Sequence, residues 1–330
     1  FYEKEFLDIG CNYVVRGEAE ETIVRIAACL ENNFFEAITR LGGISYLNTE
    51  GNIIRNEKSV GVYQLDKLPF PARDTIKQTI CLKNPVHLVT SRGCEAHCLF
   101  CSVVAFMREM GQIPGWRSRS IENIVDELDY LYSTYGVQCF KIVDDSFLES
   151  PRDTRWVNEF ANQLAMRNLK IKFRTQVRAD RLNEDIVRSL VSAGWFATSI
   201  GIENASPTAL KRMNKSASFD DNMNALELLK KYHVYVQMGM ILFDDTTSVS
   251  ELEENLEFLS SLDWPVTKGI FTEMYAAAGT PFTARLARQQ SIQQDKSGNY
   301  EYVHTSDAIV NRIYNGLRMW HKSHSNIYDH

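Results

Sequence analysis

The sequence has no apolar run that approaches the ~20 residues needed to span a bilayer, and no signal-peptide pattern near its first residue. Basic residues are not in excess either, because 36 Lys and Arg stand against 42 Asp and Glu, for a net charge of -6. That balance argues against a general nucleic-acid-binding surface without excluding a local basic patch. We therefore expect neither a membrane nor a nucleic acid as a partner.

Glycine-rich phosphate-binding motifs are also missing. Neither a Gly-x-Gly-x-x-Gly nor a P-loop spacing occurs, so the sequence does not support a dinucleotide or ATP site, and no Ser/His/Asp arrangement stands out. The 44% hydrophobic and 24% charged residues are ordinary for a globular protein. The 330 residues suffice for one large α/β barrel, or for a barrel with a smaller piece.

Cysteines are few, and they do not form the spread pattern of a secreted disulfide framework. Reduced thiols predict a cytoplasmic protein. Four of the seven cysteines stand alone, and we interpret them as small core residues that offer no second cluster site: Cys11, Cys29, Cys81 and Cys139.

The other three, Cys94, Cys98 and Cys101, lie within eight residues in a loop that follows an apolar run. Thiolates gathered so closely favour a soft metal or an iron–sulfur cluster. A zinc loop is one alternative, but zinc sites bring a fourth Cys or His at its own spacing, and the position of His97 does not indicate a ligand. Cysteines buried without a role are the other alternative. Because most cubane clusters have four cysteine ligands, three suggest one iron left open for a substrate.

The spacing C-x3-C-x2-C, with Phe100 just before the third cysteine, resembles the signature of the radical S-adenosylmethionine (SAM) enzymes. The resemblance implies that Cys94, Cys98 and Cys101 hold a [4Fe–4S] cluster whose open iron is chelated by SAM. One electron from the cluster would then cleave SAM to methionine and a 5'-deoxyadenosyl radical. An electron donor such as flavodoxin or ferredoxin is implied as a partner.

From residue 85 onward, short apolar runs alternate with amphipathic helices, two of which Ser120 and Asn183 can cap. Such alternation implies parallel strands with the helices outside. We interpret it as an α/β fold, a partial (β/α)6 TIM-like radical SAM barrel. The six strands are expected at residues 86–90, 139–143, 171–177, 196–202, 234–243 and 269–275.

Barrels of this kind carry their chemistry at the C-terminal ends of the strands, and charged residues follow those ends here. Asp144 and Asp145 follow the second strand, where a carboxylate suits the SAM ammonium group, unless one of them caps the next helix. Arg178 could meet the SAM carboxylate or ribose, or pair with Asp180. Glu203 resembles the family's fourth-strand motif, with a carboxylate bound by loop amides as the alternative.

Two further SAM contacts are expected around adenine. Met240, together with Ile241, would offer an apolar wall on the fifth strand, unless both are ordinary core residues. The main chain around Phe100 is the other expected neighbour of adenine.

The segment before the barrel resembles the end of the cobalamin-binding domain and the linker of cobalamin-dependent radical SAM proteins, with a generic α/β cap as the alternative. The resemblance lies in Val-Arg-Gly-Glu-Ala-Glu at 15–20, Gly-Ile-Ser-Tyr at 43–46 and Leu-Pro-Phe-Pro-Ala-Arg-Asp at 68–74. It makes Gly17 and Glu18 candidate cobalamin contacts. We divide the chain into the C-terminal remnant of a Rossmann-like cobalamin-binding domain, a linker, the radical SAM core and a C-terminal extension, at 1–64, 65–84, 85–288 and 289–330.

The resemblance implies cobalamin-dependent methylation of an unactivated carbon in a small-molecule or natural-product substrate. Three alternatives stay open. Radical oxidation or rearrangement without methyl transfer would use the same motifs. A methylthiotransferase would need a second cysteine-ligated cluster. A non-catalytic metal-binding or interaction module would not need the cysteine triad together with the strand-end carboxylates.

Overall fold

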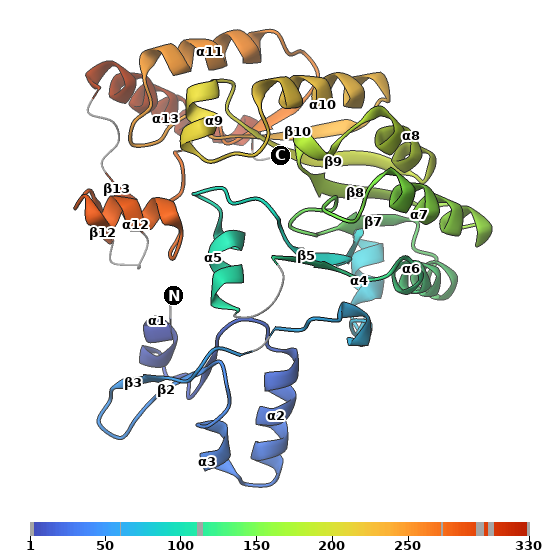
Figure 1. Ribbon diagram of the computed structural model, residues 1–330, viewed down its shortest axis with the longest axis vertical. Helices are drawn as coiled ribbons and strands as arrows, with labels where there is room; N and C mark the ends of the chain where they lie inside the picture. The colour runs from blue at the N-terminus through green and yellow to red at the C-terminus, as the bar shows by residue number, and fades with distance from the viewer. Residues whose placement is uncertain are drawn as a thin grey trace.

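The structure, a computed structural model, describes residues 3–59, 61–110, 115–271, 273–294, 300–302 and 307–328 (Figure 1). Its centre is a six-stranded parallel sheet in the order β11-β10-β9-β8-β7-β4. The strands are β4 (Val86–Leu88), β7 (Cys139–Ile142), β8 (Lys172–Val177), β9 (Trp195–Glu203), β10 (Tyr235–Met240) and β11 (Val266–Lys268). The predicted partial (β/α)6 arrangement is confirmed.

One face of this sheet packs against helices, because apolar side chains recur at every second strand position. Phe140, Phe173 and Met238 are at most 1% exposed and belong to the main core. The covering helices are α6 (Ile121–Tyr135), α7 (Thr154–Met166), α8 (Glu184–Ser192) and α10 (Phe219–Lys231). The predicted caps are present, since the side chains of Ser120 and Asn183 accept hydrogen bonds from the backbone N–H groups of Asn123 and Ile186.

The expected position of the sixth strand is wrong. The strand, β11, ends at Lys268, and the described residues among 269–275 contribute an isolated bridge from Glu273 to Phe243. Gly269 has a φ of +88°, and a Cβ there would lie 2.1 Å from the carbonyl oxygen of Met240. The backbone therefore turns away from the sheet at a position that only glycine accommodates. Thr272, within the expected strand, lies outside the described residues.

Further elements lie outside the parallel sheet and its covering helices. The cysteine loop connects β5 (Ser91–Gly93) to helix α5 (Ser102–Glu109). After α5, the chain returns in β6 (Trp116–Ser118), which pairs antiparallel with β5. The expected linker contains η1 (Leu65–Lys67) and α4 (Ile76–Cys81), and α9 (Pro207–Arg212) follows β9. After β10 come α11 (Val249–Ser260), α12 (Pro281–Arg288), the antiparallel pair β12 (Ile292–Gln294) and β13 (Tyr300–Tyr302), and α13 (Ala308–Tyr328).

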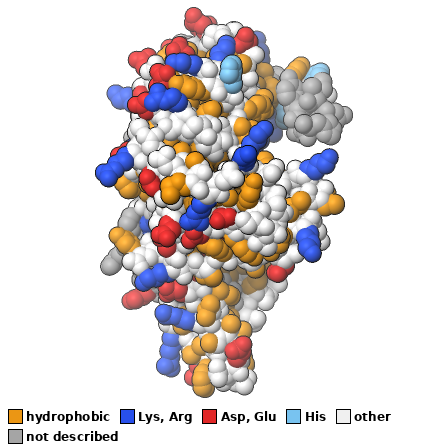
Figure 2. Space-filling view, turned by 90° about the vertical axis from the view of Figure 1, so that its right-hand side faces the viewer, with side chains coloured by type: hydrophobic (Ala, Val, Ile, Leu, Met, Phe, Trp, Pro, Cys, Tyr) orange, Lys and Arg blue, Asp and Glu red, His pale blue; other side chains and the backbone are white. Residues whose placement is uncertain are grey.

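The N-terminal segment forms the narrow lower end of the molecule (Figure 2). It contains α1 (Glu3–Asp8), β1 (Val14–Val15), α2 (Glu20–Glu31), α3 (Phe35–Ile38), β2 (Ile44–Leu47) and β3 (Ile53–Arg55), whose strands form an antiparallel sheet. Residues Glu20–Glu31 form the longest helix of this segment, and β2 and β3 form a hairpin around Gly51. No helix in the part of the chain that the structure describes is long and apolar enough to cross a membrane.

Candidate active site

The cysteine loop leaves β5 through Gly93, whose φ is +88°. A Cβ at this position would lie 2.0 Å from the carbonyl oxygen of Gly115, so only glycine allows the close approach. The backbone N–H of Cys94 then donates to that same oxygen at 3.0 Å. Cys101 ends the loop as the residue before α5. The loop is therefore held at both ends by backbone geometry.

The middle of the loop is tied to two later parts of the chain. Leu99 donates its N–H to the carbonyl of Met213 at 3.0 Å and accepts a hydrogen bond from the N–H of Phe282 at 3.0 Å. Phe100 packs with Met213 and Phe282 in a small core cluster. These contacts link the cysteine loop to the segment after α9 and to the start of α12.

The three thiols lie in protein surroundings that suit a cluster more than free cysteines. Cys98 is 6% exposed, and Cys94 and Cys101 are half-buried. Burial, together with the Glu149 carboxylate at 3.2 Å, raises the pKa of Cys94 to about 12, and burial raises the pKa of Cys98. Thiols held protonated in this way become ligands when a cation offsets the cost of the thiolate.

The donor set fits a polynuclear cluster. In the described ranges, no group of three or more His, Cys, Asp or Glu side chains surrounds a point where one metal ion could bind. A cubane places each thiolate on a different iron, so its ligands need not converge on one point. Three thiols on one loop, with the other four cysteines elsewhere in the chain, match that requirement.

Sequence analysis missed Glu149, whose carboxylate lies against the sulfur of Cys94. Glu149 is 1% exposed, and its carboxylate accepts hydrogen bonds from Arg178 at 3.1 Å and lies 2.9 Å from a guanidinium nitrogen of Arg181. Arg178 also donates to Asp180 at 3.0 Å, so the predicted Arg178–Asp180 pair is present, but it is buried and not a surface pair. The sequence signal was weak: a single carboxylate between Leu148 and Ser150, without a motif of its own.

Asp144 and Asp145 have different environments although they are adjacent. Asp144 is 3% exposed and accepts hydrogen bonds from the Thr90 N–H at 2.6 Å and the Ser91 hydroxyl at 2.7 Å, beside the guanidinium of Arg152. Its oxygens are thereby occupied within the protein, which favours a structural role for Asp144 over the predicted contact with SAM. The alternative of helix capping is wrong, because Asp153 caps α7.

Asp145 keeps the expected position at the end of β7. Its carboxylate accepts one hydrogen bond, from the Gly93 N–H at 2.9 Å, and burial, followed by the neighbouring Asp144, raises its pKa. Although the carboxylate lies among protein atoms, the residue is exposed toward a cavity of about 570 Å³. That cavity is lined by Asp145, Ser102, Val103, Phe106, Tyr275, Ala277 and Ala278.

Glu203 ends β9 in a strained conformation, with a φ of +67°. Its carboxylate lies 3.2 Å from the ammonium of Lys215, and no loop amide is among its recorded donors. Burial lowers the pKa of Lys215, but Glu203 and the nearby Cys98 thiol raise it overall. Sequence analysis missed Lys215, which has no motif of its own and is identified only by this buried pair.

Met240 and Ile241, the two residues predicted to contact adenine, lie in different parts of the core. Met240 is 2% exposed and belongs to the main core on the helix-covered face, which favours the alternative of an ordinary core residue over the predicted contact with adenine. Ile241, the next residue, is half-buried and packs in the cluster that contains Phe100. Because neighbouring strand residues point to opposite faces, only Ile241 lies on the side of the cysteine loop.

Gly17 and Glu18, the predicted cobalamin contacts, connect the N-terminal segment to the barrel. The Glu18 carboxylate contacts Arg117 at 2.7 Å and Arg92 at 3.0 Å and accepts a hydrogen bond from the Val62 N–H at 2.6 Å. A Cβ on Gly17 would lie 3.0 Å from the sulfur of Met110. Both residues are occupied by protein contacts, which favours a structural role over the predicted contacts with cobalamin.

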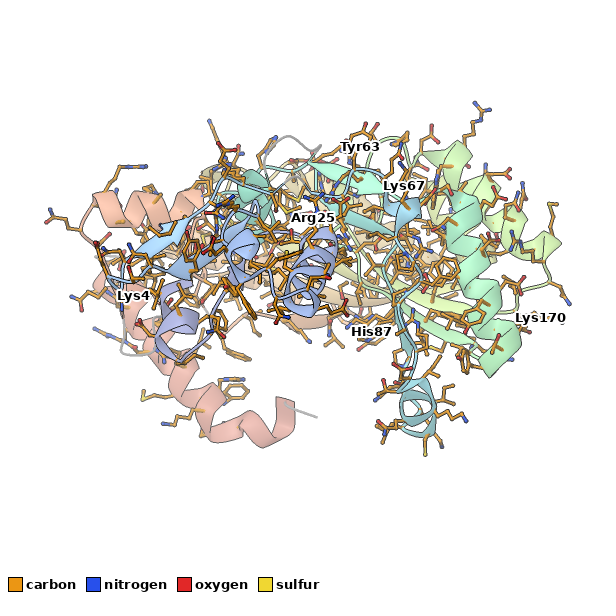
Figure 3. All side chains as sticks on the ribbon, turned by 90° about the horizontal axis from the view of Figure 1, so that it is seen from below. Lys4, Arg25, Tyr63, Lys67, His87 and Lys170 are labelled. Carbon is orange, nitrogen blue, oxygen red and sulfur yellow. The ribbon has the colours of Figure 1, made fainter. Side chains whose placement is uncertain are left out.

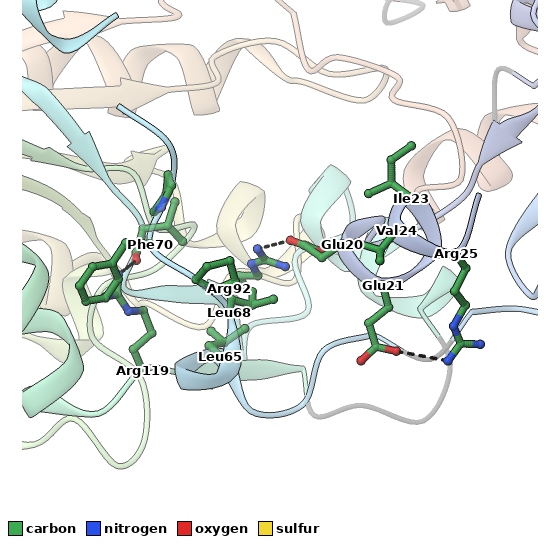
Figure 4. Close-up of a pocket in the computed structure, with 13 residues that line it drawn as sticks. Glu20, Glu21, Ile23, Val24, Arg25, Leu65, Leu68, Phe70, Arg92 and Arg119 are labelled. Atoms are coloured by element: carbon green, nitrogen blue, oxygen red, sulfur yellow. Dashed lines mark hydrogen bonds and ion pairs between the residues drawn. The ribbon is translucent and has the colours of Figure 1, made fainter. Parts of the chain in front are cut away.

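A cavity of about 710 Å³ lies nearby, between α2, the linker and the first loops of the barrel (Figure 4). Arg92 and Arg119 lie on the barrel side of this cavity. Its other walls are mainly apolar and are formed by Ile23, Val24, Leu65, Leu68, Pro69, Phe70, Pro71 and Val89. This cavity is the feature of the N-terminal region that could accommodate a large, partly apolar group.

Known proteins share this architecture. An uncharacterized methyltransferase of Pyrococcus horikoshii is 27% identical over 255 residues, which are 76% of this chain and 53% of that protein. The anaerobic magnesium-protoporphyrin IX monomethyl ester cyclase of Synechocystis sp. is 27% identical over 229 residues, 68% of this chain and 43% of that protein. The chain thus spans about half the length of these relatives.

Among solved structures, the cobalamin-dependent SAM radical enzyme OxsB with aqua-cobalamin bound has a TM-score of 0.80 at 22% identity. The match covers 98% of this chain and 52% of that one, and it shows the fold. The sequence profile of the radical SAM superfamily matches residues 88–259, more than half of the chain. The matched region includes the cysteine loop and the strand ends that carry Asp145, Arg178 and Glu203, so the chain belongs to the radical SAM superfamily.

Proposed function

We propose that this chain methylates an unactivated carbon of a small molecule in a cobalamin-dependent radical reaction. The observation that carries the proposal is the position of the cysteine loop. It lies at the C-terminal ends of the parallel strands, with one cavity at Asp145 and an apolar cavity toward the N-terminal segment. We also propose the domain division at residues 64, 84 and 288, parts of which lie outside the described residues.

Cys94, Cys98 and Cys101 would hold the cluster, and the apolar cavity at α2 would accept part of a corrinoid. When bound, the cluster with SAM supplies a carbon radical, and cobalamin supplies the methyl group. The protein contributes position and shielding from water.

The remaining polar residues of the site are suited to the zwitterionic end of SAM. Asp145 offers a carboxylate to the ammonium group, and Lys215 offers an ammonium to the carboxylate. Arg178 is held by Glu149 and Asp180, so we assign it a positioning role beneath Cys94. Ile241 and the main chain at Phe100 would contact adenine.

A second candidate function is radical oxidation or ring formation without methyl transfer. The similarity to a protein named as a cyclase supports it, while the similarity to a protein named as a methyltransferase supports the first. The electron donor, flavodoxin or ferredoxin, and a cytoplasmic location stay predictions.

The test is anaerobic reconstitution with iron and sulfide, followed by SAM, reductant and hydroxocobalamin. We expect the chain to retain cobalamin, seen in its absorbance after gel filtration, and to release 5'-deoxyadenosine. Val24→Asp, in the cavity, should lose cobalamin uptake. Leu256→Asp on α11 is the matched control, because the two side chains are 66% and 67% exposed. Deoxyadenosine release by the wild type without cobalamin uptake would overturn methylation and favour the second candidate.

A further inference from the structure

The parallel sheet has a second face that the helices do not cover, here called the inner face. It carries the strand residues that alternate with the core positions. Phe140 and Ile142 are buried under the helices, whereas Lys141 between them is only half-buried. Phe173 and Thr175 are likewise buried, and Arg174 between them is half-buried. The inner face is therefore polar where the opposite face is apolar.

Three basic side chains form a row across this face. The strand register pairs His87 of β4 with Lys141 of β7, and Lys141 with Arg174 of β8. Neighbouring strands lie roughly 4.8 Å apart, so the three side chains rise from adjacent positions at one level of the barrel. Figure 3, seen from below, shows His87 beside the segment that leads from α4 into β4.

In the described part of the chain, neither Lys141 nor Arg174 forms an ion pair with an acidic side chain. Arg174 donates to the Ser199 hydroxyl at 2.8 Å and to the side-chain oxygen of Gln237 at 3.4 Å, and both partners are neutral. Lys141 has no hydrogen-bond or ion-pair partner among the described residues. Moving along β8 from Arg174 toward the cysteine loop, the next inner-face residue is Gln176, which is also uncharged.

This pattern differs from the rest of the barrel. Arg119 contacts Glu127 at 2.5 Å, Arg178 contacts Glu149 at 3.1 Å and Arg212 contacts Asp244 at 2.8 Å. The charge of a half-buried guanidinium without a carboxylate partner is not neutralised, and some of its N–H groups stay available as hydrogen-bond donors. The positive charges also act on His87: burial lowers the pKa of its imidazole, and Lys141 and Arg73 lower it further.

We propose that the inner face binds the anionic group, a phosphate or a carboxylate, of the substrate, through Lys141 and Arg174 with Ser199 and Gln237 as neutral partners. Guanidinium and ammonium groups recognise both anions through charge-assisted hydrogen bonds. The substrate class is therefore an anionic small molecule. This inference rests on the proposed function, since it assigns one end of the substrate of the same site.

The geometry also limits the length of that substrate. Arg178 lies four positions after Arg174 along extended backbone, a distance of roughly 13 Å. Arg178 contacts Glu149, which lies 3.2 Å from the sulfur of Cys94. A substrate anchored at Arg174 thus reaches the cysteine loop with a reactive carbon on the order of 10 Å from its charged group.

The test is calorimetric titration of the reconstituted chain with inorganic phosphate and, separately, with succinate, at low and high salt. We expect saturable binding of one equivalent of at least one of the two anions, weakened by salt. Arg174→Gln and Lys141→Gln should each raise the dissociation constant at least tenfold, and Arg188→Gln, an exposed arginine of α8, should leave it unchanged. Binding of phosphate alone assigns a phosphorylated substrate, and binding of succinate alone assigns a carboxylate.

Two outcomes would overturn the inference: neither anion saturates the wild type, or Arg174→Gln binds it as tightly as the wild type. Lys141→Gln removes no hydrogen bond or ion pair of the described residues, so a weaker anion affinity of this variant does not come from a disturbed fold. Circular dichroism verifies that Arg174→Gln is folded. The titration uses neither SAM nor reductant. A failure of anion binding is therefore distinguishable from a failure of the proposed radical reaction.

Discussion

Replacing Asp144 by alanine tests whether this carboxylate is part of the fold and not of the SAM site. The side chains of Asp144 and Arg152 are both fully buried, and their closest polar atoms are 3.5 Å apart. Burial lowers the pKa of Arg152 to about 10, and the neighbouring carboxylate opposes that shift. Arg152 also stacks on Trp156, with its guanidinium carbon 4.4 Å from the ring centroid.

Removing one partner of a buried pair leaves an uncompensated charge, which costs about 3 to 5 kcal/mol. With a urea dependence of roughly 3 kcal/mol/M, the unfolding midpoint should fall by about 1 to 1.7 M. Tryptophan fluorescence is the assay, because Trp116 and Trp156 both contact Arg152. Asp145→Ala is the control: it removes a single hydrogen bond and should cost no more than about 1 kcal/mol.

A double variant separates the lost charge pair from lost packing. Asp144→Ala with Arg152→Met leaves no buried charge, and it should recover at least half of the loss, because an apolar replacement of a buried pair is often tolerated. Equal midpoints for Asp144→Ala and Asp145→Ala would refute the structural assignment of Asp144.

Three other changes test separate parts of the structure. Lys215→Met should raise the KM for SAM at least tenfold while cluster absorbance stays, and an unchanged KM would exclude Lys215 from the SAM site. Glu18→Gln weakens the contacts to Arg117 and Arg92 and should lower the unfolding free energy by about 2 kcal/mol in urea titrations, whereas a wild-type midpoint would contradict this link. The imidazole of His87 should titrate below its ordinary value of 6.5 by NMR, since burial, Lys141 and Arg73 disfavour its charged form. Lys141→Gln should raise that pKa, and no change would show that the row does not act on His87.

The parallel sheet could be predicted because its signals are local and repeated. The first five strands carry buried side chains at alternate positions, and helices between them begin at caps such as Ser120 and Asn183, so period and capping agree. The sixth strand was misplaced because the run at 269–275 is apolar enough for a strand, while Gly269 turns the backbone out of the sheet. That turn depends on a close approach to Met240, which no local pattern reveals.

Within the site, the cysteine loop was predictable and its surroundings were not. The loop needs only sequence spacing, but the roles of Asp144 and Asp145 depend on which way two adjacent side chains point. Met240 and Ile241 differ in the same way, since one faces the helices and the other the loop. Glu149 and Lys215 come from distant parts of the chain and are identified only when the fold brings them beside Cys94 and Glu203.

The central claim, that three cysteines on this loop support radical SAM chemistry, is tested most directly by reductive cleavage of SAM. Wild-type chain reconstituted anaerobically with iron and sulfide is compared with Cys94→Ala, Cys98→Ala and Cys101→Ala, each incubated with SAM and reductant, and 5'-deoxyadenosine is quantified by liquid chromatography. Cys81→Ala is the control, because this cysteine lies outside the loop and is exposed, contrary to the expectation of a core residue. We expect deoxyadenosine from the wild type and the control, and none from the three loop variants. Normal release by any loop variant, or none by the wild type with its iron bound, would contradict the account.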